Sequence, residues 1–118
     1  MVEADAANAT VNYEALDALK SVLGLEFAGL VRDFNEQMAS GLVRLELAIA
    51  RRDARRISAV AHTLKGSALS LHCKALAECC GRVERGAALL VQSGKDDLLE
   101  ELRDSVRSAV SAIDDWAS

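Results

Sequence analysis

Apolar residues recur at three- and four-residue steps along most of this chain, the spacing that places side chains on one stripe of an α-helix. The pattern falls into one short and four long segments: Tyr13 to Val22, Glu26 to about Arg51, Asp53 to about Leu71, about Lys74 to Gln92, and from near Lys95-Asp96 onward. The breaks between segments contain residues that cap or end helices, which are Gly24, Asp53 and Ser93-Gly94. The pattern therefore predicts an all-α chain.

Composition favours the same fold class. Proline is absent and aromatic residues make up 3% of the chain, while Ala, Leu, Val, Glu and Arg dominate, as in packed helices. A length of 118 residues suits one domain with one core. Because the connections between helices are short, we expect an up-down antiparallel four-helix bundle with a short extra N-terminal helix packed on one end. Residues 1–12 are expected to be a polar lead-in, and residues 13–118 the bundle.

Charge and cysteine usage exclude several classes of protein. The net charge is -4, and the basic residues are scattered among acidic ones, so nucleic-acid binding is not expected. The first ten residues lack the features of a signal peptide, and no apolar run reaches membrane-spanning length. The three cysteines do not form a disulfide framework and suit a reducing compartment. We therefore expect a cytoplasmic protein without membrane insertion.

His62 is the candidate reactive residue, on the outer side of the 53–71 segment. With about 100° of rotation per residue, the apolar residues from Ile57 to Leu71 fall within about 60° either side of Ile57. His62 lies at about 140° on the same wheel, so we expect it to face solvent. An exposed imidazole is largely uncharged at neutral pH and offers one unshared electron pair for nucleophilic attack.

The neighbours of His62 suggest that another protein approaches it. Gly66 lies one turn beyond His62, where glycine costs roughly 1 kcal/mol relative to alanine, so its presence needs a reason. Ala59 lies one turn before, and Leu69 offers an apolar contact further on. Arg55 adds a positive charge that an acidic pocket could meet. We expect these small, apolar and basic residues to form a docking strip.

Lys65 is the candidate residue for stabilising a phosphoryl group on His62. It stands three residues after the histidine, close enough to place its ammonium beside a phosphoryl group on the ring and offset its negative charge. The sequence has no Gly-rich phosphate loop and no kinase signature, so the chain is not expected to phosphorylate itself from ATP. A phosphoryl group would have to come from another protein.

The segment AHTLKGSALSLHCKALAECCGRVE, within Asp53 to Glu84, resembles the histidine-containing phosphotransfer (HPt) domain of bacterial multistep phosphorelays. The family pattern is a histidine followed by x-L-K-G and two small residues, in a four-helix bundle. Phe34 and the spacing of Leu45, Ala48, Ile49 and Asp53 resemble the family's preceding helix. The likeness covers about Tyr13 to Glu84, with a compatible last helix.

The resemblance implies a role for each matching residue. His62 would be the phosphoacceptor, Lys65 the neighbouring positive charge, and Gly66 the clearance for the partner, with Ser67 as a small residue of the motif. The partners implied are response-regulator receiver domains and a hybrid sensor kinase. Mg²⁺ would be held by the receiver, so this chain needs no cofactor or metal. One departure is His72, where many members carry glycine in the turn between the two central helices.

Simpler interpretations remain for several of these residues. Lys65 could be only a solvated charge, and Ser67 could bond back to the preceding turn. His72, Cys73, Cys79 and Cys80 together would suit zinc, but their spacing favours two packed thiols and a polar turn.

Three classes of function stay open from the sequence. The first is a phosphoryl carrier that docks receiver domains and is expected to be a monomer. The second is a helical adaptor bundle that binds signalling proteins but carries no phosphate. The third is a dimeric phosphotransferase resembling the dimerisation domain of histidine kinases, which would require a self-associating bundle.

Overall fold

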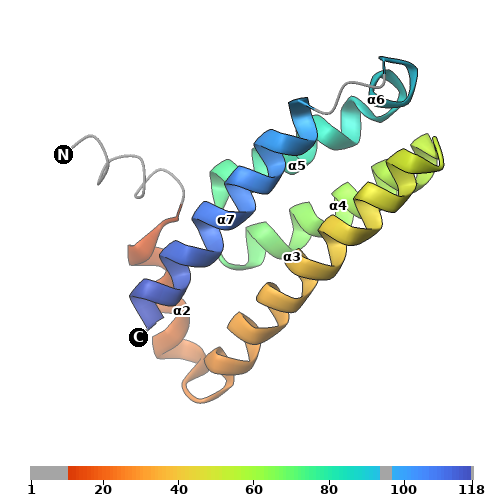
Figure 1. The fold of residues 1–118 in the computed structure, drawn as a ribbon. Helices are drawn as coiled ribbons and strands as arrows, with labels where there is room; N and C mark the ends of the chain where they lie inside the picture. Colours follow the sequence, from red (N-terminus) through yellow and green to blue (C-terminus); the bar gives the residue numbers. More distant parts are fainter. Residues whose placement is uncertain (1–10, 94–96, 118) are drawn as a thin grey trace.

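The computed structural model describes residues 11–93 and 97–117, and within these ranges every regular element is a helix (Figure 1). The helices are α2 (Tyr13–Leu23), α3 (Glu26–Ala50), α4 (Ala54–Ser70), α5 (Lys74–Arg85), α6 (Ala87–Ser93) and α7 (Asp97–Ala117). The predicted all-α fold class is confirmed. Residues 1–10 of the expected lead-in and the expected helix start at Lys95-Asp96 lie outside the described residues.

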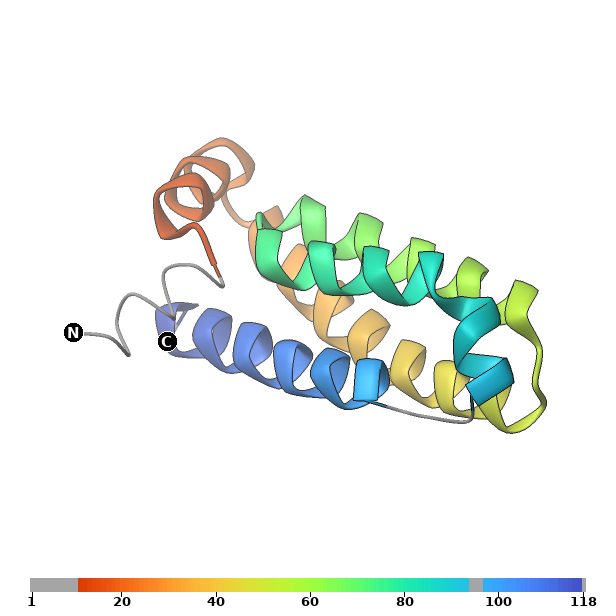
Figure 2. The ribbon, with the colours of Figure 1, turned by 90° about the horizontal axis from the view of Figure 1, so that it is seen from above.

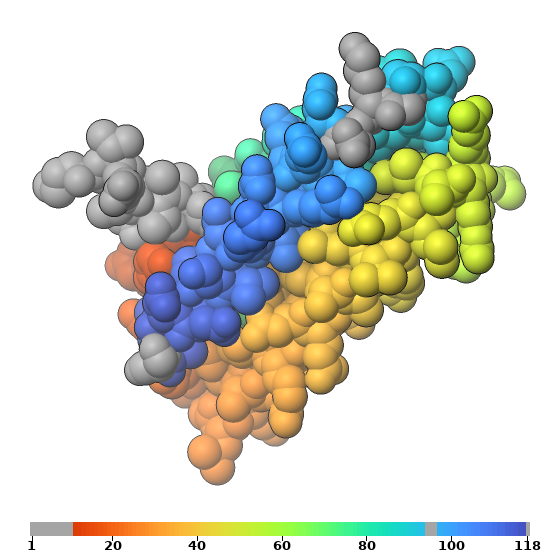
Figure 3. Space-filling model, in the orientation of Figure 1, coloured from red at the N-terminus to blue at the C-terminus, as the bar shows by residue number. Residues whose placement is uncertain are grey.

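The four longest described helices lie side by side, as Figure 2 shows. Helix α4 packs against both α3 and α5, α5 packs against α7, and α7 also contacts α3. Figure 3 shows the face on which α7 runs alongside α3. Each helix turns its apolar stripe inward. The largest fully buried side chains include residues of every long helix and Leu71 just after α4: Phe34, Met38, Leu45, Ile57, Leu64, Leu71, Leu76, Val83, Leu102 and Ile113. None of the described helices could span a membrane, because none combines the necessary length with sufficient hydropathy.

Helix α2 lies at one end of this arrangement (Figure 1). The Trp116 ring near the end of α7 packs edge-on against Phe27, with 5.4 Å between ring centroids. Its Nε1 donates a hydrogen bond of 3.0 Å to a carboxylate oxygen of Asp17, and the Lys20 ammonium lies 5.4 Å from the ring centroid. Trp116 thus links the end of α7 both to α2 and to the start of α3.

Helix α4 begins where the sequence predicts. The Asp53 side chain accepts a hydrogen bond of 3.1 Å from the backbone N–H of Arg56, as an N-cap residue does. The prediction of Asp53 as N-cap is confirmed, and the cap fixes where the helix that carries His62 begins.

The turn between α4 and α5 is tight although it contains no glycine. His72 adopts φ 57°, in the left-handed region that favours glycine. Its N–H donates to the Leu69 carbonyl at 3.1 Å, and the Cys73 N–H donates to the Ala68 carbonyl at 2.9 Å. These two bonds form a Schellman motif. The departure from the family pattern at this position therefore leaves the turn intact, with the strain carried by a histidine.

The predicted single helix from Lys74 to Gln92 is wrong in one respect, because it is divided at Gly86 into α5 and α6. A side chain at residue 86 would lie 3.0 Å from the Arg82 carbonyl oxygen and 3.2 Å from a methyl group of Leu98. Leu98 belongs to α7, so a side chain at this break would be crowded by another helix. Periodicity within the segment could not reveal that contact.

Candidate functional site

His62 lies on the outer face of α4, with 71% of its side chain exposed. The residues that the wheel assigns to the core are buried on the opposite side: Ile57, Val60, Ala61, Leu64 and Ala68. The predicted orientation of His62 toward solvent is therefore confirmed. The rotation of α4 is determined by this buried stripe, so the ring cannot turn inward without exposing the core.

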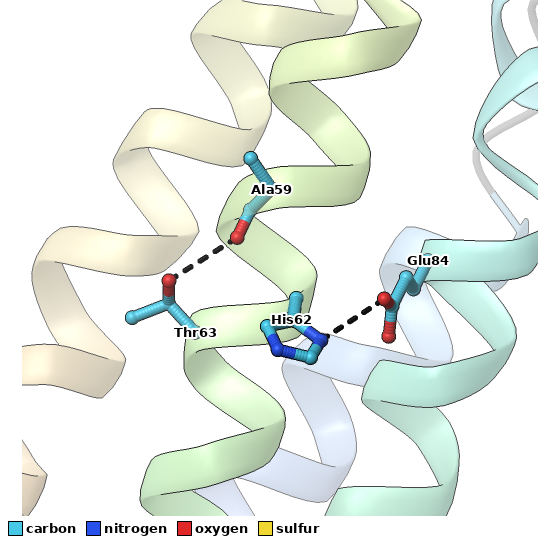
Figure 4. A network of polar contacts seen from close by, with 4 residues as sticks. All are labelled: Ala59, His62, Thr63 and Glu84. Atoms are coloured by element: carbon cyan, nitrogen blue, oxygen red, sulfur yellow. Dashed lines mark hydrogen bonds and ion pairs between the residues drawn. The ribbon is translucent and has the colours of Figure 1, made fainter.

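The His62 ring is held by a residue of the neighbouring helix. Nδ1 of His62 lies 3.0 Å from a carboxylate oxygen of Glu84 on α5, as Figure 4 shows. An ionised carboxylate only accepts hydrogen bonds, so Nδ1 is the donor. In a neutral imidazole this places the unshared electron pair on Nε2. The nitrogen that does not bond to Glu84 is therefore the nucleophilic one.

Glu84 was not identified as a site residue from the sequence. A signal was nevertheless present, because two antiparallel helices joined by a tight turn bring residues at equal distance from the turn to the same level. Position 62 precedes His72 by as many residues as Arg82 follows it. Glu84 lies within one turn of that level, next to the buried Val83. The sequence could thus have limited the candidates for the hydrogen-bond partner of His62 to a few residues of α5.

The four residues of the predicted docking strip are exposed on α4. Ala59, Gly66 and Arg55 are exposed, and Leu69 is 52% exposed. A side chain added at residue 66 would meet no described atom within 4 Å. Packing within the chain therefore does not require glycine at this position, and the space beside His62 is open. Arg55 lies about two turns of helix from His62 and is the most distant member of the strip.

Lys65 lies half-buried one turn after His62, on the side of α4 that faces α5. No hydrogen bond or ion pair joins its ammonium to another residue among those described. Its charge is thus available to a negatively charged group that arrives from outside. Lys65 thus lies near the site, and no hydrogen bond joins it to the His62 imidazole.

The three cysteines are free and buried. Burial raises the pKa of Cys73 to about 12 and that of Cys80 to about 12, and it also raises the pKa of Cys79. Neutral thiols of this kind are poor nucleophiles and poor metal ligands. The predicted packing of Cys79 and Cys80 is confirmed. Cys73 lies in the predicted turn, but its side chain is also buried, so the turn is not polar at this residue. Within the described ranges, no three His, Cys, Asp or Glu side chains are placed to hold a metal ion.

The family model of the Hpt domain matches residues 29–116. The chain belongs to the Hpt domain family. Its role is phosphotransfer in a phosphorelay of two-component signal transduction. Members of this family are phosphocarriers rather than kinases, and they interact with receiver domains and histidine kinases.

The fold is shared with a solved structure of the same class. The crystal structure of histidine-containing phosphotransfer protein B from Pseudomonas aeruginosa PAO1 superposes with a TM-score of 0.80. The alignment covers 92% of this chain and 95% of that one, at 20% sequence identity. No curated protein sequence matches this chain at a significant level. The backbone arrangement is therefore retained where most side chains differ.

Proposed function

We propose that His62 is the phosphoacceptor, taking a phosphoryl group from the aspartyl phosphate of one receiver domain and passing it to another. The observation that carries this proposal is the exposed imidazole whose Nδ1 is bonded to Glu84, which leaves Nε2 free to react. A carrier needs such a nucleophile on its surface because the donor and the acceptor are both other proteins. The same chain would act without kinase activity of its own.

The transfer step is an in-line displacement at phosphorus. The electron pair on Nε2 forms the new N–P bond, while the P–O bond to the receiver's aspartate breaks and its electrons stay on the carboxylate. The ring gains positive charge as the bond forms, since Nδ1 keeps its proton. The Glu84 carboxylate, 3.0 Å away, stabilises that charge. The reverse sequence returns the phosphoryl group to an aspartate.

Lys65 and Gly66 would assist in different ways. The free ammonium of Lys65 offsets negative charge on the transferring phosphoryl oxygens. Gly66 leaves open the space that the edge of the partner's active site must enter, since no described atom lies within 4 Å of a side chain placed there. Ala59, Leu69 and Arg55 would supply further contact area for the receiver.

Several wider features belong to the same proposal. We infer an up-down antiparallel four-helix bundle. In Figure 2 the sequence colours of neighbouring helices run in opposite directions, which supports this arrangement. We further infer a cytoplasmic monomer that binds no cofactor of its own. Mg²⁺ would be held by the receiver, and the donor would be a receiver of a hybrid sensor kinase.

A phosphotransfer profile tests the function. Each purified receiver of the organism is labelled with radioactive phosphate and mixed with the chain, and the label is followed against time. We expect rapid labelling of the wild type by its cognate receiver and none of His62→Gln. His72→Gln is the matched control, because it alters the second of the two histidines and should accept label normally. Label on His62→Gln would refute the assignment.

The same experiment separates the alternatives. Receiver binding without any labelling of the wild type would favour the adaptor bundle. A dimer mass in solution, together with labelling from ATP when an ATP-binding domain is added, would favour the kinase-like phosphotransferase. A monomer that is labelled only by phosphorylated receivers supports the carrier.

A further inference from the structure

A positively charged groove runs between α4 and α5 beside the candidate site. Its volume is about 440 Å³, and its charged lining consists of Lys65, Lys74, Arg82 and Arg85 with one carboxylate, Glu78. Lys65 is one turn from His62 on α4, and Arg85 directly follows Glu84 on α5. A protein that covers His62 would therefore cover the groove as well.

The positive charge of the groove is largely unpaired. Within the described part of the chain, Lys65, Lys74 and Arg85 form no ion pair, and Arg82 lies 3.7 Å from Glu101 in a mostly exposed pair. Glu101 therefore offsets part of the Arg82 charge, and the other three cations contribute most of the positive charge. The whole chain carries a net charge of -4, so this basic patch stands out against an acidic molecule. Electrostatic attraction to a negative partner would be concentrated here.

The Arg85 guanidinium lies over a glycine. A side chain at Gly81 would come within 3.1 Å of an Arg85 guanidinium nitrogen, and Gly81 itself lines the groove and is buried. Glycine is unfavourable in a helix interior, and here it leaves the space that the guanidinium occupies. Glycine at position 81 thus leaves room for the Arg85 guanidinium at the groove, while the Arg85 side chain stays exposed.

We propose that this groove binds carboxylate side chains of the receiver domain that docks at His62, and thereby selects receivers with an acidic docking surface. The inference rests on the proposed function, since it assumes a receiver at His62. Charge complementarity across an interface accelerates association and discriminates between partners more than it adds affinity. A receiver with a basic surface at this place would be repelled by these cations, and one with a neutral surface would gain no such attraction.

Charge reversal in the groove tests the proposal. The double variant Lys74→Glu and Arg85→Glu changes two lining cations that are outside the phosphoryl chemistry. The matched control is Arg107→Glu together with Arg103→Glu, which reverses two cations lining the groove between α3 and α7 on the opposite side of the molecule.

Dissociation constants for the cognate receiver are measured with each variant chain and the wild type at low and at high salt. Phosphorylation by phosphoramidate checks that His62 remains reactive in each.

We expect about a tenfold weaker binding of the receiver for the groove variant at low salt, and a much flatter dependence on salt than the wild type shows. The control variant should bind as the wild type does. Equal binding and equal salt dependence for the groove variant and the wild type would overturn the proposal, as would a wild type that binds no receiver. A wild type that binds receivers but is never labelled would refute the phosphoacceptor assignment. In that case the binding data alone would decide the groove proposal.

Discussion

Glu84 holds the imidazole of His62 from a different helix, 22 positions further along the chain. The bond both orients the ring and determines which nitrogen carries the proton. The side chain of Glu84 is 26% exposed and that of His62 is 71% exposed, so the pair contributes little to folding. Its main consequence is for reactivity at Nε2.

Glu84→Gln should slow phosphotransfer while leaving the fold intact. The amide can still accept a hydrogen bond, but it lacks the negative charge that stabilises the ring as the N–P bond forms. A loss of about 1.4 kcal/mol of transition-state stabilisation corresponds to a tenfold lower rate. Rapid-quench measurements with a labelled receiver give the rate, and receiver affinity should be unchanged. An unaltered rate would show that Glu84 has no role in the chemistry.

Gly66→Ala should stabilise the protein and impair transfer. Alanine in an exposed helix position is about 1 kcal/mol more favourable than glycine, and no described atom obstructs its methyl group. The same methyl group would occupy the space that the partner needs. Denaturant unfolding and transfer rates are measured on one preparation. Ala59→Gly is the control, since it should destabilise by about 1 kcal/mol without blocking the receiver.

His72→Gly should stabilise the turn between α4 and α5. A histidine at φ 57° bears a cost of about 1 kcal/mol that glycine avoids, partly offset by the greater freedom of glycine in the unfolded chain. A net gain of about 0.5 kcal/mol in the free energy of unfolding is expected. His72→Ala keeps the strain and should give no gain. Destabilisation by glycine would mean that the histidine side chain itself supports the turn.

Gly41→Ala should destabilise the packing of α3 on α4. A methyl group at residue 41 would overlap the buried Leu64 side chain, and overpacking of this kind costs about 1–3 kcal/mol, which exceeds the gain in helix propensity. Adding Leu64→Val removes the overlapping atoms. A double-mutant cycle should therefore show favourable coupling between the two changes. Additive effects would argue against the contact.

Stability should fall as the pH rises above 9. Burial raises the pKa of Cys73 and Cys80 to about 12 from an ordinary value of 9.0. The folded protein keeps these protons while the unfolded chain loses them, so the contribution of each thiol is full below pH 9 and is lost progressively up to about pH 12. Urea unfolding at several alkaline pH values measures the slope. Cys73→Ala should reduce the slope, and an unchanged slope would contradict this account.

Local patterns were sufficient to predict most of the helices and the orientation of His62. The helix that carries it has a cap at Asp53 and a regular buried stripe, and both depend only on residues a few positions apart. The motif around Lys65 and Gly66 is likewise contained in one helix. Such features are determined by helical geometry, which is the same in every fold.

Contacts between helices were decided by the tertiary structure. The crowding at Gly86, the bond from Glu84 to His62, and the overlap of residue 41 with Leu64 each depend on a side chain from another helix. The grouping of cations from α4 and α5 into one groove has the same origin. These relationships depend on how two helices are rotated and how closely they approach. Many residues distributed through the core set both quantities together.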